Sequence, residues 1–271
     1  MSVNDERGNR IARLLNPGLI AVVRALRTDQ VVPMAEALVA GGIIAIEITT
    51  TTPNHLDAIR QARERMGDRA LVGVGTLLDV PGATAALAAG AEFVVSPVGA
   101  TELIELAHAA GCPIMLGAYT ATECLRVHAA GADFVKLFPA DTLGPGYVKA
   151  LRAPLPDLRI VPTGGVDLAT ASQWLEAGCV ALGVGSSLLK PDILKSDDWE
   201  SEIQPIVRSL ARHKVNRVDW PKIFIGPVNA THIALSPDDN RRTFDKRNVM
   251  SPDDSAGAIN RKRTVHSRVF S

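Results

Sequence analysis

The stretch GADFVKLFPADTLGP (131–145) places Lys136 in the middle of an apolar run that has the pattern of a buried strand. Alternate residues of a strand point to opposite faces, so Lys136 shares its face with Phe134 and Phe138. A lysine that faces a barrel interior loses hydration, which favours the neutral amine, and a neutral amine can attack a ketone to form a Schiff base. From position alone, a lysine stem lying along the core with its ammonium at the rim is an equally good explanation.

Glu47 is a second charged residue in an apolar run, IIAIEIT (43–49). Its carboxylate can form a structural ion pair with Lys136, or it can carry the protons that Schiff-base chemistry requires. An amine and a carboxylate on two separate core strands favour a functional site.

Two glycine motifs follow later apolar runs, Thr163–Gly164–Gly165 and Gly185–Ser186. Glycine exposes backbone N–H groups, and loops of this kind bind phosphate after the last two strands of many barrels. Each motif alone is compatible with an ordinary turn. The two together favour a phosphate site.

These residues belong to a regular alternation over residues 18–214 of short β-branched runs and Ala/Leu-rich helical segments. The eight runs are 18–24, 43–49, 70–76, 92–97, 113–119, 133–139, 159–165 and 180–186. Helical segments include 29–42, 78–90, 121–131 and 167–178, each ending in a glycine stop signal. Continuously apolar strands separated by helices predict a parallel sheet, and eight such units predict an α/β fold of the (β/α)8 TIM-barrel type. An open doubly wound sheet is the alternative, but no GxGxxG motif opens the first helix.

The segment before Pro17 is expected to cap the barrel bottom as a short helix, and residues 197–214 to form a last amphipathic helix. Residues 1–214 therefore make the predicted barrel domain. Residues 215–271 carry 10 Lys and Arg against 6 Asp and Glu, with SPDD twice, and do not continue the period. We expect them to form an irregular extension that is flexible or depends on a partner.

The composition limits the class of protein. Lys plus Arg and Asp plus Glu both number 29, so nothing in the overall charge indicates a nucleic-acid partner. The polar N-terminus and the lack of a 20-residue apolar run predict a cytoplasmic protein with no membrane partner. Cys112, Cys124 and Cys179 lack metal-ligand spacing and are expected to be reduced core residues, so no metal site is predicted.

The polar groups fall at the strand ends, where a barrel of this type places its working residues. In chain order, the motifs GGIIAIEIT, VGVGTLL, FVVSP, GAYTATE, FVKLFPA, VPTGGV and GVGSSLL resemble the 2-keto-3-deoxy-6-phosphogluconate / 4-hydroxy-2-oxoglutarate aldolase family over residues 12–212. The resemblance implies a class I aldolase that needs no metal or cofactor and is usually a homotrimer. Such an enzyme cleaves a keto-acid phosphate to pyruvate and glyceraldehyde 3-phosphate, or 4-hydroxy-2-oxoglutarate to pyruvate and glyoxylate.

The resemblance also implies individual roles. Lys136 matches the Schiff-base lysine and Glu47 the general acid/base. Thr76 matches a group that holds the pyruvate carboxylate, and Thr163 a residue on the aldehyde side. Gly164, Gly165 and Ser186 match phosphate-binding groups, with Gly185 in the same glycine motif as Ser186, and Pro97 and Phe138 match pocket-wall positions.

One departure from the family concerns Thr51, which stands where many members have an arginine that grips the pyruvate carboxylate. A hydroxyl donates only one uncharged hydrogen bond, so carboxylate binding must rely more on Thr76, on backbone N–H groups or on Arg24 at the end of the first run. The galactonate epimer is thus an alternative substrate. A phosphate-binding barrel isomerase or synthase and a non-catalytic barrel are the remaining alternatives.

Overall fold

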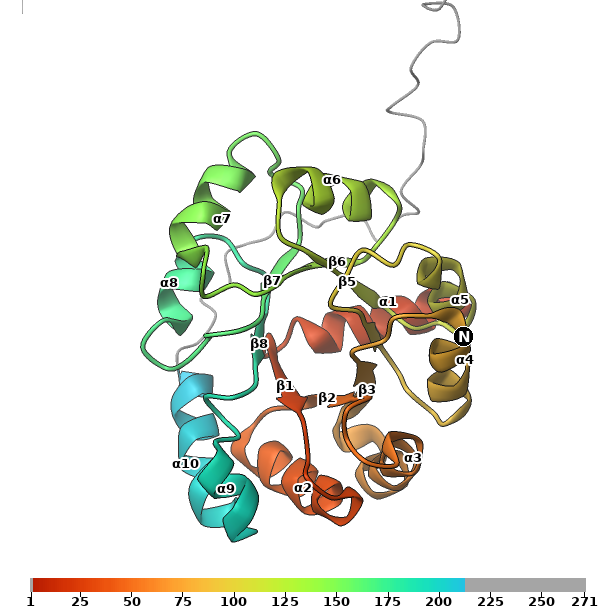
Figure 1. Cartoon of the computed structure of the whole chain (residues 1–271), viewed down its shortest axis with the longest axis vertical. Helices are drawn as coiled ribbons and strands as arrows, with labels where there is room; N and C mark the ends of the chain where they lie inside the picture. The colour runs from red at the N-terminus through yellow and green to blue at the C-terminus, as the bar shows by residue number, and fades with distance from the viewer. Residues whose placement is uncertain (1, 213–271) are drawn as a thin grey trace, which may run out of the picture. The chain divides into compact units, whose positions relative to one another are not determined.

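The computed structural model describes residues 2–212, in which eight strands alternate with helices (Figure 1). The strands are β1 (Leu19–Val23), β2 (Ala45–Thr49), β3 (Leu71–Gly75), β4 (Val94–Val95), β5 (Ile114–Ala118), β6 (Phe134–Leu137), β7 (Ile160–Pro162) and β8 (Leu182–Val184). Each strand lies inside one of the eight predicted apolar runs, so the strand prediction is confirmed.

The strands form one closed parallel barrel. Hydrogen-bonded neighbours follow the order β7-β6-β5-β4-β3-β2-β1-β8. A bridge between Thr163 and Gly183 then joins the β7 and β8 ends of this order, and the amide of Val180 donates to the carbonyl of Ile160 at 3.0 Å. The predicted (β/α)8 TIM barrel is therefore confirmed over the described residues, and the open-sheet alternative is wrong.

Helices surround the barrel and include all four of the predicted helical segments. They are α1 (Val3–Leu14), η1 (Thr28–Gln30), α2 (Val31–Gly41), α3 (His55–Met66), η2 (Gly67–Arg69), α4 (Val80–Ala88), α5 (Leu103–Ala109), α6 (Ala121–Ala129), α7 (Gly144–Arg152), α8 (Ala171–Glu176), α9 (Pro191–Ser196) and α10 (Trp199–Arg212). The predicted stop glycines after α2, α4, α6 and α8 have φ between 95° and 108°, a region that side chains with a Cβ avoid.

The helix α1 closes the bottom of the barrel, as predicted from the sequence. Ser2 and Asp5 form a capping box at its start, and Leu14 packs with Ile11 and Leu15 against the lowest layer of interior side chains. Figure 1 shows α1 crossing behind the strands. Its Arg7 donates to Asp133 just before β6 at 3.3 Å, so a charge pair also holds the helix to the barrel.

The main apolar core lies between the strands and the surrounding helices. The last helix, α10, packs on α2, where Val207 meets the backbone at Gly41. Cys112, Cys124 and Cys179 are free and buried in this core, as predicted. Burial raises the pKa of the Cys112 and Cys124 thiols to about 11 and that of Cys179 to about 12. These cysteines are therefore packing residues with little thiolate at neutral pH.

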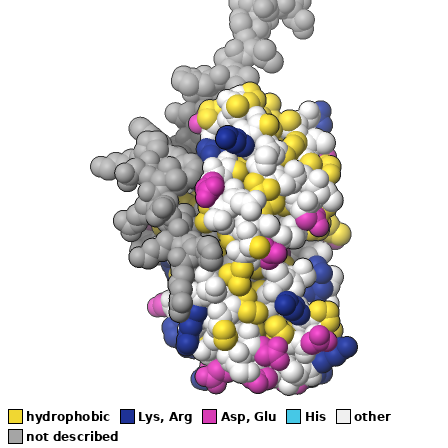
Figure 2. All heavy atoms as spheres, turned by 90° about the vertical axis from the view of Figure 1, so that its left-hand side faces the viewer, with side chains coloured by type: hydrophobic (Ala, Val, Ile, Leu, Met, Phe, Trp, Pro, Cys, Tyr) yellow, Lys and Arg dark blue, Asp and Glu magenta, His cyan; other side chains and the backbone are white. Residues whose placement is uncertain are grey.

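Residues 215–271, predicted to form an irregular extension, lie outside the described residues. Within residues 2–212, no helix has the length and apolar character needed to cross a bilayer. On the side of the barrel that carries α7 to α10, acidic and basic side chains are interspersed among apolar ones (Figure 2). This mixture agrees with the equal numbers of acidic and basic residues in the chain.

Candidate active site

The barrel interior changes character from bottom to top. Its lower part is filled by apolar side chains from the strands, among them Ile20, Leu71, Phe93, Met115, Phe134 and Val161. On β2, the next inward position after Ala45 is Glu47. On β6, the next inward position after Phe134 is Lys136. The alternation of the strands therefore points both charged side chains into the barrel, above its apolar floor.

Glu47 and Lys136 meet inside the barrel although β2 and β6 are not neighbouring strands. The Lys136 Nζ atom lies 3.4 Å from Oε1 of Glu47 and donates a hydrogen bond to it. Only 6% of the lysine side chain and 3% of the glutamate side chain are exposed. The sequence predicted each group separately, and the fold brings them into contact.

An aromatic ring at the barrel rim contacts the lysine of the pair. The Nζ atom of Lys136 lies 5.6 Å from the centre of the Phe138 ring, which is 39% exposed at the barrel rim. Pro97 follows β4 and approaches the backbone of Gly117 on β5. Phe138 thus contacts the Lys136 amine from the rim, and Pro97 lies at the end of β4.

Glycines face the barrel interior beside the buried pair, and one of them, Gly75, makes room for the Glu47 side chain. Gly73 of β3 is in register with Glu47, and Gly117 of β5 is in register with Lys136. A Cβ atom at Gly75 would lie 2.6 Å from Cγ of Glu47 and would overlap its carboxylate. The inward alternation within VGVGT (72–76) is the sequence signal for Gly73 and Gly75, whereas their packing is visible only in the structure.

Thr76 has an unusual backbone conformation. Its φ is +64°, in the left-handed region that β-branched residues avoid. The Thr50 hydroxyl donates to the Thr76 carbonyl at 3.0 Å, and the Thr50 amide donates to the Gly75 carbonyl at 2.9 Å. Such a conformation persists only where the surrounding structure imposes it, and residues of this kind cluster at functional sites.

Arg24 is exposed at the end of β1 and contacts the loop that follows β2. Its Nε donates to the Thr51 hydroxyl at 3.1 Å. The structure thus brings Arg24 together with the position where the family often has an arginine. Thr51 and Arg24 are both near the mouth of the barrel, at the ends of two adjacent strands.

The predicted phosphate loops follow neighbouring strands, β7 and β8, as expected. Gly164 and Gly165 have φ of +94° and +69°, which only glycine adopts readily. Ser186 is exposed, and Ser187 donates to the Val166 carbonyl at 2.6 Å, which ties the two loops together. Thr163 is buried at the β7–β8 closure; Gly164 and Gly165 follow it, and Gly185 and Ser186 follow β8.

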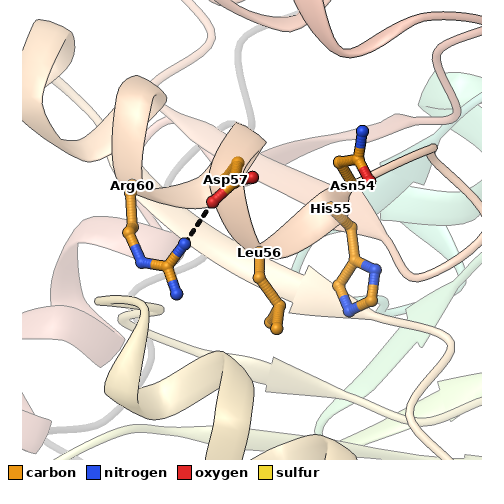
Figure 3. Close-up of a pocket in the computed structure, with 5 residues that line it drawn as sticks. All are labelled: Asn54, His55, Leu56, Asp57 and Arg60. Atoms are coloured by element: carbon orange, nitrogen blue, oxygen red, sulfur yellow. Dashed lines mark hydrogen bonds and ion pairs between the residues drawn. The ribbon is translucent and has the colours of Figure 1, made fainter.

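A separate hollow lies at the start of α3 and is lined by Asn54, His55, Leu56, Asp57 and Arg60 (Figure 3). Arg60 forms an ion pair with Asp57 there. None of the predicted site residues lines this hollow. The chemistry-bearing groups gather instead at the barrel mouth, which fits the rule for enzymes of this fold.

Comparisons with known proteins show the family of the chain. A family model described as KDPG and KHG aldolase matches residues 11–205. The chain is 36% identical over 200 residues to the 2-dehydro-3-deoxy-phosphogluconate aldolase of Pseudomonas aeruginosa, which covers 73% of this chain and 88% of the relative. It is 35% identical over 173 residues to the 2-dehydro-3-deoxy-6-phosphogalactonate aldolase of Escherichia coli, covering 64% and 84%.

A solved structure of KDPG aldolase from Legionella pneumophila has a TM-score of 0.68 and 25% identity, covering 78% of this chain and 98% of its own. Fold and relatives together define an aldolase, a carbon–carbon lyase built on a (β/α)8 barrel. The chain belongs to the KDPG and KHG aldolase family. The family resemblance predicted from seven sequence motifs is confirmed.

The glycine that makes room for Glu47 can be tested by substitution. We expect Gly75→Ala to lower the free energy of unfolding by about 1–3 kcal/mol, because the new methyl group overlaps a side chain that is enclosed on all sides. Chemical denaturation followed by circular dichroism measures this change.

Gly146→Ala in α7 is the matched control, since no atom lies within 4 Å of a methyl group there. Alanine is the better helix former, so we expect this variant to be as stable as the parent or up to about 1 kcal/mol more stable. Equal stability of the two variants would contradict the close packing of Gly75 on Glu47.

Proposed function

We propose that this protein cleaves 2-keto-3-deoxy-6-phosphogluconate to pyruvate and glyceraldehyde 3-phosphate through a Schiff base on Lys136. The observation that carries the proposal is the buried contact of 3.4 Å between the Lys136 amine and the Glu47 carboxylate, in a member of an aldolase family. A neutral amine is the nucleophile that a ketone requires, and the adjacent carboxylate is a group that can take up and return protons.

The reaction proceeds in three stages. The Lys136 amine attacks the C2 ketone, and loss of water gives a protonated imine. Glu47, directly or through a water, then removes the proton of the C4 hydroxyl, so that the C3–C4 bond breaks, the aldehyde leaves, and the bonding electrons pass into the imine to give an enamine. Protonation at C3 and addition of water to the imine release pyruvate and regenerate the lysine.

The other predicted residues bind the two ends of the substrate. Thr76 and Arg24, with Thr51 beside it, form the carboxylate end of the site. The loops after β7 and β8, with Gly164, Gly165, Gly185 and Ser186, bind the phosphate. Thr163 lines the aldehyde side, and Pro97 and Phe138 form walls.

A related structure supports the covalent chemistry. The Legionella pneumophila KDPG aldolase is described as holding pyruvate as a covalent carbinolamine intermediate. A carbinolamine is the adduct of an amine and a ketone that precedes an imine, and the attack proposed for the Lys136 amine would form an adduct of this kind. In this mechanism the imine withdraws electrons, and we therefore propose that the reaction needs no metal ion.

Reductive trapping tests the nucleophile. With pyruvate and sodium borohydride we expect a mass increase of one reduced pyruvate unit, located at Lys136 by peptide mass spectrometry. Lys136→Met removes the amine, so it should give no adduct and no cleavage of 2-keto-3-deoxy-6-phosphogluconate. Cleavage by the parent is expected to persist in EDTA.

Glu47→Gln is the comparison variant for this experiment. It retains the lysine, so the adduct should still form, whereas cleavage should fall by about 10²–10⁴-fold because the proton carrier is lost. No adduct in the parent, together with full activity of Lys136→Met, would refute the aldolase mechanism. That result would favour a phosphate-binding isomerase or synthase, or a non-catalytic barrel.

The galactonate epimer is the second candidate substrate. One observation favours it: the phosphogalactonate aldolase of Escherichia coli is 35% identical to this chain. The chemistry at Lys136 and Glu47 would be unchanged. We also propose that the same site cleaves 4-hydroxy-2-oxoglutarate to pyruvate and glyoxylate.

We expect kcat/KM for the gluconate substrate to exceed that for the galactonate epimer by about tenfold or more. A site whose polar groups hydrogen-bond a hydroxyl of one epimer leaves those groups unpaired when the other epimer binds. Parallel assays of pyruvate release with the two epimers measure this ratio. A ratio below one would reassign the natural substrate to the galactonate series.

We also propose that the protein assembles as a homotrimer. Apolar side chains are exposed on the loops after β1, β3 and β4 and at the start of α4, with Leu26 at 54%, Leu78 at 59%, Val80 at 40% and Val98 at 50%. A structure with 31% identity and a TM-score of 0.66 is described as a cage designed by fusing symmetric oligomeric domains. Exposed apolar groups at one end of a molecule favour such an association.

Light scattering coupled to size-exclusion chromatography should give three times the chain mass of 28.8 kDa. Leu78→Glu should lower this mass, because it places a charge among the exposed apolar groups. Val3→Glu on α1, at the opposite end of the barrel, is the control that should leave it unchanged. A parent protein that elutes with the mass of a single chain would contradict the proposal.

A further inference from the structure

The run Thr49–Thr52 carries four successive hydroxyl groups, and the structure gives every one of them a hydrogen bond. The run ends β2 and begins the loop before α3, and β2 lies between β1 and β3 in the barrel. The residues that bond to it lie at the ends of these two strands: Val23, Arg24 and Ala25 at the end of β1, and Thr76 at the end of β3. The run therefore links the two strand ends that carry the proposed carboxylate ligands.

The direction of three of these hydrogen bonds can be deduced. The Thr49 hydroxyl lies 3.2 Å from the Val23 carbonyl, which can only accept, so Thr49 donates its single proton there. Thr49 and Thr51 hydroxyls are 2.8 Å apart, and the proton between them must then come from Thr51. Arg24 Nε, which can only donate, completes the series to the Thr51 oxygen at 3.1 Å.

These four groups form a directed series, from Arg24 Nε–H through the Thr51 and Thr49 hydroxyls to the Val23 carbonyl, which we call the hydroxyl chain. Each hydroxyl in it donates once and accepts once, and hydrogen bonds in series strengthen one another. Thr51 has no proton left to donate to a substrate carboxylate. It therefore cannot replace the family arginine by contacting that carboxylate directly.

What Thr51 can do is fix the direction of the Arg24 guanidinium. An exposed arginine side chain has many rotamers, and its planar fork binds a carboxylate well only in the right orientation. The hydrogen bond from Arg24 to the Thr51 hydroxyl uses Nε, the guanidinium nitrogen attached to the aliphatic part of the side chain. Both terminal nitrogens are left for a bidentate contact with a carboxylate. Among residues 2–212, no Asp or Glu forms an ion pair with Arg24, so its charge is available.

The same run acts on Thr76. The Thr50 hydroxyl donates to the Thr76 carbonyl at 3.0 Å, and Thr76 is the β-branched residue held at φ +64°. A conformation this unfavourable persists only when its surroundings impose it. The Thr50 contact is one such restraint, and it is made by the same segment that orients Arg24.

We propose that Thr50 and Thr51 are positioning residues, which orient Thr76 and Arg24 to bind the carboxylate of a 2-keto acid. The proposal rests on the proposed function and deepens it: the segment that lacks the family arginine supplies hydroxyls that orient an arginine from the adjacent strand. Neither threonine contacts the substrate. The role is specific to substrates that carry a carboxylate beside the ketone.

The test compares two ketones in borohydride trapping at Lys136: pyruvate, which has the carboxylate, and acetone, which lacks it. We expect Thr51→Val to raise the pyruvate concentration for half-maximal trapping by about tenfold, the effect of one well-oriented charged contact, with the maximal rate nearly unchanged. Trapping of acetone should match the parent. Thr51→Ser keeps the hydroxyl and should restore pyruvate binding, and Thr51→Ala is a second truncation should the valine variant fold poorly.

A double variant distinguishes positioning from direct contact. If Thr51 acts only through Arg24, then Arg24→Met with Thr51→Val should bind pyruvate as weakly as Arg24→Met alone. Thr50→Val should also weaken pyruvate and spare acetone, through Thr76. Thr84→Val is the matched control, because the Thr84 hydroxyl also donates to a backbone carbonyl, that of Val80 on α4, away from the site.

Each outcome decides the proposal. Equal losses for pyruvate and acetone would show a merely structural role and overturn it, as would unchanged pyruvate binding in both Thr51→Val and Thr51→Ala. Additive losses in the double variant would mean that Thr51 contacts the substrate itself and would also overturn it. Absence of any adduct with pyruvate in the parent protein would instead refute the proposed function, and so the two failures are distinguishable.

Discussion

The burial of one amine against one carboxylate inside the barrel is the constraint on which the rest of the site depends. Lys136 and Glu47 are almost fully enclosed, and a charge in such a place is costly unless it is paired. Their contact at 3.4 Å satisfies that requirement. It also places a nucleophile and a proton carrier together in a region from which bulk water is largely excluded, which suits imine chemistry.

The architecture makes this pair possible by dividing the barrel interior. The helix α1 and a layer of large apolar side chains fill the lower part, so the interior is not a pore. Higher up, glycines face inward from strands β3 and β5, and Gly75 leaves no space even for a methyl group beside Glu47. A barrel interior packed as densely as a protein core accepts a long charged side chain such as that of Glu47 only where the facing position carries no side chain.

Around the mouth, the strand ends are connected by side chains as well as by their ladder hydrogen bonds. The threonines after β2 contact the ends of β1 and β3, and Ser187 contacts the loop after β7. Each contact is a single hydroxyl bond, yet together they restrict Arg24, Thr76 and the glycine loops that the proposed function requires. Loops held in this way bind a small ligand with less loss of conformational entropy.

The sequence by itself determined the eight strands, the (β/α)8 architecture and the capping role of α1, because apolar periodicity and glycine stops are local patterns. The resemblance of its seven motifs indicated the aldolase family. The sequence also marked Lys136 and Glu47 as unusual. It could not show that they touch, since they are far apart in the chain and lie on strands that are not neighbours. Nor could it reveal that Gly75 makes room for Glu47, or that the Thr51 hydroxyl is fully used by Arg24 and Thr49. Those facts depend on strand register and barrel closure, which only the tertiary structure decides.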